Sequence, residues 1–243
     1  VNRNNVLFIS SVDVQNTIQP ILFPQKNPAG KTVTTICLDP GHGGRDPGNM
    51  EKKNQEKKLT LLMAEELGRI LRNAGFRILQ TRTSDRFVEL SDRAEFANRN
   101  KADLFISLHY NSSESSQVCG TEVYCLSPAG TMSSNEGGGK SETGSYPGNA
   151  QNERNVFLAY QIQKSLLKNV AMEDRGIKRA RFEVLREVKM PAVLIEGGFM
   201  SNSREANQIE DTASCRKVAL AIANGILAYK RAVEADRPEA KKR

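Results

Sequence analysis

The chain contains two histidines, and each follows a stretch that is typical of a buried β-strand. His42 lies in the glycine-rich turn DPGHGG directly after the apolar residues 34–38, and His109 ends the stretch LFISLH. A third apolar stretch, PAVLI, runs into Glu196. Because ligands bind outside the carboxyl ends of the strands in open α/β sheets, we expect these three side chains at one edge of a sheet.

Two imidazoles and a carboxylate are donors that suit a zinc ion, whose fourth position then stays open for water. A further carboxylate near such a site would act as a general base rather than as a ligand. Three acids are candidates for these roles, namely Glu51, Glu56 and Glu196, and spacing in the sequence does not decide among them. The pattern predicts a metal site at the strand ends.

Each of these features also has a simpler interpretation. A histidine after a strand is more often a turn or surface residue than a ligand. The GHGG turn could cradle a phosphate, although it lacks the Lys-Ser/Thr ending of a P-loop. Glu56 could be a favourable acid in the first turn of a helix. Glu196 could be a solvated strand end, but an unpaired carboxylate after PAVLI would be costly to bury.

Segments typical of strands and helices alternate along the chain, which predicts an α/β fold. We expect a mostly parallel or mixed central sheet with helices on both faces, and the zinc site at the carboxyl ends of its strands. Helices are predicted over residues 56–75, 91–100, 155–170, 202–211 and 213–233. Strands are predicted over residues 34–38, 76–82, 103–109, 120–127, 181–186 and 191–198, and one more could span residues 5–14. Asn202 and Glu205 are spaced as a capping box.

Composition divides the chain into three parts. Residues 1–30 are expected to form an N-terminal extension or the remnant of a preceding region, and residues 31–233 a compact catalytic domain. Residues 234–243 form a tail that is too charged to fold alone. The polar, Gly/Ser-rich residues 127–154 are expected to be a solvated surface loop, with a flexible lid over a substrate groove as the second interpretation, since three consecutive glycines disfavour a helix.

The net charge of +7 favours anionic partners, but the basic residues are scattered and the chain has no Trp, which argues against a nucleic-acid platform. No apolar run reaches the roughly 18 residues of a membrane helix, so no transmembrane segment is expected. The chain begins at Val1 rather than Met, so an export signal could have been removed. The four cysteines are expected to be buried free thiols, with a disulfide between Cys119 and Cys125 left open.

Seven motifs occur in an order that resembles the zinc-dependent N-acetylmuramoyl-L-alanine amidases of the Amidase_3 family, over about residues 33–230. They are LDPGHGGRDPG, EKKLTLLMAEEL, TRTSDRFVELSDRAEFAN, ADLFISLHYNS, GTEVY, FEVLR and PAVLIEGGFMSN. The resemblance implies that His42, Glu56 and His109 bind Zn²⁺ and that Glu196 is catalytic. Glu56 is favoured over Glu51 because it immediately precedes the helix start KKLTL.

The same resemblance implies hydrolysis of the amide bond between the lactyl group of N-acetylmuramic acid and the L-alanine of the peptidoglycan stem peptide. Asn111, two residues after a ligand, and Arg186, at the end of FEVLR, could hold the peptide or muramoyl groups. A surface charge is an equally good interpretation of Arg186. Since peptidoglycan lies outside the cytoplasmic membrane, we expect an exported enzyme of the periplasm or the extracellular cell wall.

Two other functions compete with this interpretation. A zinc carboxypeptidase acting on cell-wall peptides can share a similar sheet, but such enzymes usually read His-x-x-Glu, and position 45 here is Arg45. A non-catalytic peptidoglycan-binding module could keep the fold, but it would not need intact His42, His109 and Glu196. We further expect a monomer that needs no activator protein, because residues 127–154 show no apolar helical face with which to plug the site.

Overall fold

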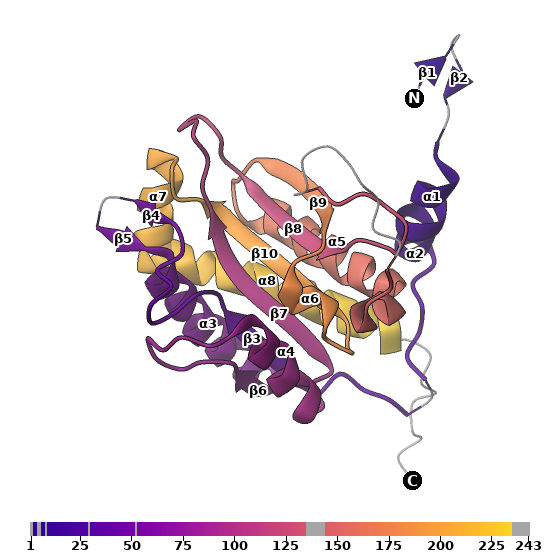
Figure 1. Cartoon of the computed structure of the whole chain (residues 1–243), viewed down its shortest axis with the longest axis horizontal. Coiled ribbons are helices and arrows are strands. Elements are labelled where there is room, and N and C mark those ends of the chain that lie inside the picture. The colour runs from indigo at the N-terminus through magenta and orange to yellow at the C-terminus, as the bar shows by residue number, and fades with distance from the viewer. Residues whose placement is uncertain are drawn as a thin grey trace.

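The structure is a computed structural model that describes residues 2–3, 6–7, 9–28, 30–51, 53–134 and 144–234. Its centre is a six-stranded sheet with the strand order β6-β3-β7-β10-β8-β9 (Figure 1). The strands are β3 (Thr35–Pro40), β6 (Arg77–Gln80), β7 (Leu104–Asn111), β8 (Thr121–Leu126), β9 (Asp174–Ala180) and β10 (Ala192–Phe199). The first four in spatial order are parallel, whereas β8 runs antiparallel to β10 and parallel to β9. The predicted mixed sheet is confirmed.

Helices cover both faces of this sheet, as the alternation of segments predicts (Figure 1). One face carries the long helices α3 (Glu56–Asn73), α5 (Asn152–Asn169) and α8 (Thr212–Glu234). The other face carries the shorter α4 (Leu90–Arg99) and α6 (Glu183–Arg186). Side chains alternate between the two faces along each strand, so Ile36 packs in the core under the long helices and Cys37 in the core under α4 and α6.

The predicted strand over residues 181–186 is wrong. These residues contain the short helix α6, and the strand lies just before them as β9. The sequence analysis did not identify β9 because its residues, DRGIKRA, are mostly charged and do not alternate cleanly. A charged strand is stable here because β9 is an edge strand that pairs only with β8, and charged side chains are typical of such edges.

The possible strand over residues 5–14 is also wrong for most of its length. Among the described residues of this range, the strand is β2 (Val6–Leu7), which pairs with β1 (Asn2–Arg3). Ser10 then caps a helical segment, because its hydroxyl accepts from Val12 N at 3.2 Å. This segment consists of α1 (Ser11–Asp13), the π-helical turn η1 (Val14–Ile18) and α2 (Gln19–Leu22).

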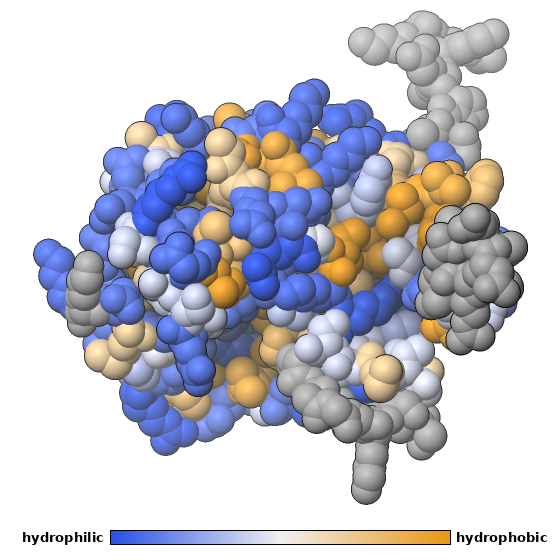
Figure 2. All heavy atoms as spheres, turned by 90° about the horizontal axis from the view of Figure 1, so that it is seen from above, coloured by the Kyte–Doolittle hydropathy of each residue, from blue (hydrophilic) through white to orange (hydrophobic). Residues whose placement is uncertain are grey.

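The helical N-terminal segment packs beside α5 and leaves several apolar side chains exposed. These are Ile9, Val12, Val14, Leu22 and Phe23. Figure 2 shows a face that is mostly hydrophilic, with apolar side chains gathered in separate patches, one of them toward the end where α1 and α2 lie. Within the described residues, no helix combines the length and the apolar character needed to cross a membrane.

The helix α7 (Ser203–Glu210) begins at the predicted N-cap, where Asn202 Oδ1 accepts from Glu205 N at 3.1 Å. In a complete capping box the Glu205 side chain would also accept from Asn202 N. The Glu205 carboxylate instead accepts from Phe199 N and Gly120 N, both at 2.8 Å. Glu205 therefore ties α7 to the end of β10 and to the start of β8.

All four cysteines are free, so Cys119 and Cys125 are not bridged. Cys37 and Cys125 are buried as expected, but Cys119 and Cys215 are only half-buried. Part of the Gly/Ser-rich segment, residues 135–143, lies outside the described residues. On either side of it, Ser134 N donates to Arg179 O, and the 3-10 helix η2 (Pro147–Gln151) leads into α5.

Candidate active site

His42 stands in a tight loop that leaves the end of β3. Its φ of 63° lies in the left-handed region, which costs a non-glycine residue roughly 1–2 kcal/mol. Gly41, just before it, donates to Leu108 O at 3.0 Å and so lies against β7. A Cβ at Gly41 would come within 2.2 Å of the His109 ring, so only glycine lets the two histidines approach. Their ring centroids are 4.9 Å apart.

Two buried arginines hold this loop by its carbonyl groups. Arg82 Nη2 donates to Gly41 O and to Lys57 O, both at 2.7 Å, and so joins the His42 loop to the start of α3. Arg93 Nη2 donates to His42 O at 2.8 Å. The carbonyls that the turn exposes are thereby satisfied, and the left-handed conformation of His42 is stabilised.

Glu56 is the first residue of α3, and its side chain is 1% exposed. Its Oε2 lies 3.0 Å from His42 Nε2, and its Oε1 lies 3.0 Å from His109 Nδ1. Asn49 N and Tyr110 N also donate to this carboxylate. Burial acts to raise the pKa of Glu56, but the hydrogen bonds from the two histidines outweigh it and hold the pKa far below its ordinary value.

The sequence analysis did not identify Asp46, which orients the His42 ring. Asp46 Oδ2 lies 2.8 Å from His42 Nδ1. Burial acts to raise the pKa of Asp46, but hydrogen bonds from Gly48 N and His42 lower it, so the carboxylate is an acceptor only. It therefore accepts a hydrogen bond from Nδ1 and orients the ring so that Nε2 is directed at Glu56. The spacing His-x-x-x-Asp in GHGGRD was the available signal.

Of the three candidate acids, Glu51 lies away from the histidines. It belongs to the small hairpin of β4 (Met50–Glu51) and β5 (Asn54–Gln55). In the part of the chain that the structure describes, the group able to hold a metal ion consists of His42, Glu56 and His109, whose donor atoms lie within 4.8 Å of one another. The geometry thus separates Glu56 from Glu51, which the spacing could not do.

Glu196 lies in β10, directly beside His109 in the parallel pairing with β7. Its Oε2 atom is buried and has no hydrogen-bond partner within the described residues. Burial raises the pKa of Glu196 well above its ordinary value, and the negative charges of Glu56 and Glu122 add to this effect. An orphaned carboxylate oxygen in the middle of a polar cluster is typical of a functional group rather than a structural one.

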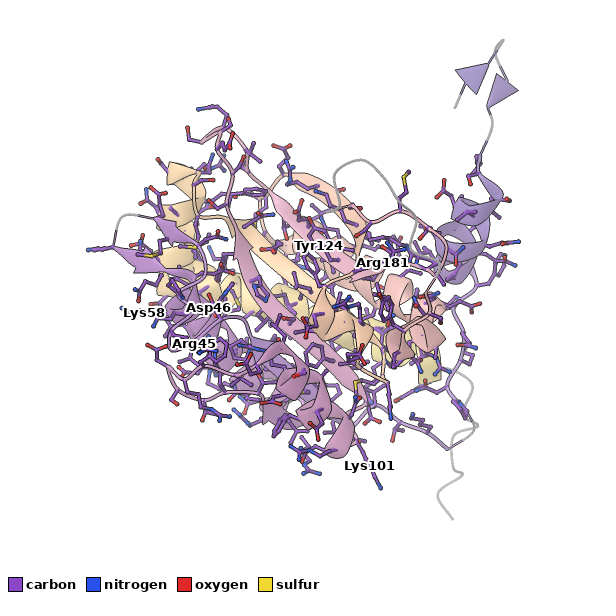
Figure 3. The ribbon with its side chains drawn as sticks, viewed as in Figure 1. Arg45, Asp46, Lys58, Lys101, Tyr124 and Arg181 are labelled. Atoms are coloured by element: carbon purple, nitrogen blue, oxygen red, sulfur yellow. The ribbon has the colours of Figure 1, made fainter. Side chains whose placement is uncertain are left out.

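A cavity of about 230 Å³ opens beside the two histidines. It lies on the face of the sheet that carries α4 and α6, and much of its wall is apolar. The apolar wall is formed by Leu90, Phe182, Val184 and Leu194. In Figure 3, Arg45 and Asp46 mark the end of the sheet where the His42 loop lies, and Lys101 marks the opposite end, where β7 begins.

The two remaining candidates, Asn111 and Arg186, lie in different surroundings. Asn111 ends β7, and its Nδ2 donates to Glu122 Oε1 at 2.7 Å. Arg186 ends the helix α6 rather than a strand, and its guanidinium carbon lies 5.1 Å from the ring centroid of Tyr146. The cavity wall includes Val184 of the same short helix, two residues before Arg186.

Comparison with known proteins places the chain in one family. Residues 36–228 match the family model Amidase_3, described as N-acetylmuramoyl-L-alanine amidase. The chain belongs to this amidase family. The matched region contains all of the residues described above, from the His42 loop to Glu196, and the predicted family is confirmed.

Two relatives and one solved structure show the extent of the likeness. This chain is 31% identical to N-acetylmuramoyl-L-alanine amidase LytC of Bacillus subtilis over 95% of its length, but it spans only 41% of LytC. It is 32% identical to AmiA of Salmonella typhimurium over 80% of this chain and 75% of AmiA. The catalytic domain of CwlV from Bacillus (Paenibacillus) polymyxa superposes with a TM-score of 0.67 at 34% identity, covering 81% and 97% of the two chains.

Proposed function

We propose that this chain is a zinc-dependent amidase that hydrolyses the bond between the lactyl group of N-acetylmuramic acid and the L-alanine of the peptidoglycan stem peptide. The observation that carries the proposal is the convergence of His42, Glu56 and His109 on one point, with the unpartnered Glu196 Oε2 beside them. The amidase family gives the class of bond.

The three donor side chains fit a zinc ion. Donor atoms that share one tetrahedral zinc ion lie about 3.3 Å apart, and both histidines hold a ring nitrogen 3.0 Å from a Glu56 oxygen. Two imidazoles disfavour magnesium and calcium, which prefer oxygen ligands throughout. We therefore assign His42, Glu56 and His109 as the residues that would hold zinc.

A zinc ion held there would act as a Lewis acid and make water nucleophilic near neutral pH. Glu196 accepts a proton from the attacking water on Oε2, while the water oxygen forms its bond to the lactyl carbonyl carbon. Glu196 then donates that proton to the L-alanine nitrogen as the carbon–nitrogen bond breaks. The second proton of the water passes from the new lactyl carboxyl group to the amine, so the products are a lactyl carboxylate and a peptide with a protonated L-alanine amine, and atoms and charges balance.

The cavity beside the histidines is the proposed place for the groups next to the scissile bond. Its apolar wall suits the methyl groups of the lactyl unit and of L-alanine. Asn111 and Arg186 remain our proposed contacts to the peptide or muramoyl groups. We place the catalytic domain at residues 31–233, with the N-terminal segment as an addition to it and residues 234–243 as a tail.

The place of action follows from the substrate. We propose that the amidase is exported to the periplasm or the extracellular cell wall, acts as a monomer on peptidoglycan, and needs no activator. A zinc carboxypeptidase and a non-catalytic peptidoglycan-binding module are the two alternatives. Arg45 replaces the acid of the usual carboxypeptidase motif, and it pairs with Glu89 rather than facing Glu56.

The deciding experiment measures zinc content and hydrolysis together. We expect purified protein to bind about one zinc ion and to release dye from labelled peptidoglycan, with a free L-alanine amine as the new terminus. A chelator should abolish release, and added zinc should restore it. Zinc binding without hydrolysis would support the binding module, and release of a C-terminal amino acid would support the carboxypeptidase.

A further inference from the structure

The sheet continues beyond Glu196 into a charged cluster that the proposed chemistry does not use. Glu122 of β8 lies opposite Glu196 in the antiparallel pairing with β10, and its side chain is 2% exposed. Two cations from the edge strand β9 converge on it. Arg175 Nε lies 3.0 Å and Lys178 Nζ 2.5 Å from Glu122 Oε2.

Neutral groups complete the coordination of the Glu122 carboxylate. Asn111 Nδ2 and the hydroxyl of Tyr124 each donate to Oε1 at 2.7 Å. Burial acts to raise the pKa of Glu122, but hydrogen bonds from Lys178, Tyr124 and Arg175 outweigh it and lower the pKa. Glu122 is therefore a fixed negative charge, and it holds the cations in place.

Two cations, Arg175 and Lys178, contact a single carboxylate, that of Glu122. Arg175 and Lys178 share one carboxylate, and each of their side chains is still 29% exposed. Among the described acids, neither Glu196 nor Asp174 forms an ion pair with them, and Asp174 instead accepts from Gln163 and Gly176 N. One positive charge is thus available to an anion that approaches this face of the sheet.

The cluster shares a face with the cavity beside the histidines. Leu194, which lines the cavity, pairs with Tyr124, and Glu196 pairs with Glu122, so all four side chains point to the same side of the sheet. Tyr124 lies over the middle of the sheet in Figure 3. Neighbouring strands are about 4.8 Å apart. Glu122 is on β8, next to the β10 strand that carries Glu196, and Arg175 and Lys178 are on β9, the second strand from β10.

The two halves of the substrate differ in charge. The muramoyl half has no free acid, because its lactyl carboxyl group is in the amide that is cut. The peptide half can carry a free carboxylate on the residue after L-alanine, about 7 Å from the scissile bond at roughly 3.4 Å per residue. We propose that Lys178 and Arg175 bind this carboxylate, and that Glu122 is the positioning residue that orients both cations.

This proposal rests on the amidase function, and its test uses two substrates that differ in a single group. Both are N-acetylmuramoyl-L-alanyl dipeptides whose second residue is a γ-linked glutamate, with its α-carboxyl group either free or converted to the primary amide. We expect the wild-type amidase to show a kcat/KM about tenfold or more higher for the free acid, as a charge-assisted hydrogen bond would give.

The ratio of kcat/KM for the free-acid substrate to kcat/KM for the amide substrate is then compared among variants. This ratio does not change when only the fraction of active protein falls. Lys178→Met should bring the ratio close to one, and Lys178→Arg should retain most of the preference. Arg175→Gln should lower the ratio by a smaller factor, because its Nη1 and ring contacts also fix it to Cys119 O and Phe199. Lys168→Met, an exposed lysine of α5, is the matched control and should leave the ratio unchanged.

Equal kcat/KM values for the two substrates in the wild type would overturn the proposal. It would also fail if Lys178→Met lowered both values by the same factor, since Lys178 would then act on Glu196 or on folding. Hydrolysis of neither substrate by zinc-loaded protein would instead count against the amidase function. In that case calorimetric titration with the two compounds still tests the cations, and equal affinities would reject the carboxylate site.

Discussion

Glu56 contacts the two histidines through different carboxylate oxygens, and this arrangement brings the three side chains together as possible ligands of one metal ion. In the absence of a metal ion, the carboxylate is stabilised by the ring nitrogens of His42 and His109 and by two backbone N–H groups. Each imidazole therefore has one nitrogen directed at the same small volume. Removal of either ring leaves two protein donors, fewer than the three that typically hold a catalytic zinc ion.

His42→Ala and His109→Ala should each lose zinc and activity together. Metal content after purification and dialysis, measured by mass spectrometry, should fall well below one equivalent in both variants. Far-ultraviolet circular dichroism should stay close to that of the wild type, because both rings lie at the edge of the core. Full zinc occupancy in either variant would remove that residue from the set of ligands.

Glu196→Gln should separate binding of the metal from catalysis. The amide keeps the size of the side chain but cannot accept a proton from water, so we expect kcat to fall by about 10²–10⁴ while zinc stays bound. Glu95→Gln, on the exposed side of α4, is a control that should change neither quantity. Loss of zinc from Glu196→Gln would make Glu196 a ligand and reverse its assignment relative to Glu56.

At the scale of elements, one buried ion pair fastens the strand that carries the His42 loop. Asp39 of β3 accepts from Arg93 of α4 at 2.8 Å, from Thr81 at 2.6 Å and from Ser107 of β7 at 2.9 Å. Burial acts to raise the pKa of Asp39, but the charge of Arg93 and these hydrogen bonds hold it below its ordinary value. Asp39 thus couples three elements at the end of the sheet where the site lies.

Asp39→Asn should lower the free energy of unfolding by about 3–5 kcal/mol at pH 7, because the Arg93 charge stays buried without its partner. Since the pKa is lower in the folded state, the stabilisation is present above the unfolded-state pKa near 3.9. It is lost as the pH falls through the folded-state value.

Urea titrations in the presence of a chelator should show the largest difference between wild type and Asp39→Asn from pH 5 to pH 7. The difference should shrink below about pH 4, where the carboxylate of the unfolded chain takes up a proton, and it should be lost once the pH falls below the folded-state pKa. A difference that is independent of pH down to pH 2 would show that the carboxylate charge contributes nothing to stability.

At the scale of the whole molecule, both cores and the site are built from strands that come from distant parts of the chain, and the described ends of the Gly/Ser-rich segment are attached to this framework. Its ends are fastened, with Ser134 N bonded to Arg179 O and Asn149 Nδ2 bonded to Ser127 O. The site residues His42, Glu56 and His109 make their contacts with one another and with neighbouring loops.

Replacement of residues 135–145 by a short Gly-Ser linker should leave hydrolysis of a soluble muramoyl peptide within about threefold of the wild type. The reason is that three consecutive glycines cost on the order of 3 kcal/mol relative to alanine in a helix, which disfavours a helical plug. Initial rates at equal zinc occupancy provide the measurement. A many-fold gain in rate would identify the segment as inhibitory and would overturn our proposal that no activator is needed.

The sequence by itself determined the features that depend on local pattern. Apolar runs and glycine or proline stops predicted most helices and strands, and with them the loop position of His42 just after β3; His109 and Glu196, expected at strand ends, lie inside the carboxyl-terminal halves of β7 and β10. The resemblance then supplied Glu56 as the remaining ligand. The local pattern did not predict β9, because an edge strand tolerates charged residues and these interrupt the apolar alternation by which a strand is identified.

Only the tertiary structure decided which acids meet the histidines and which charges meet one another. Glu51 and Glu56 are five residues apart in the sequence, but Glu51 belongs to β4 and Glu56 begins α3, and only Glu56 lies between the two histidine rings. Glu122 meets Arg175 and Lys178 because the register of β8 and β9 aligns residues more than fifty positions apart. Such pairings depend on strand order and register, which no local periodicity encodes.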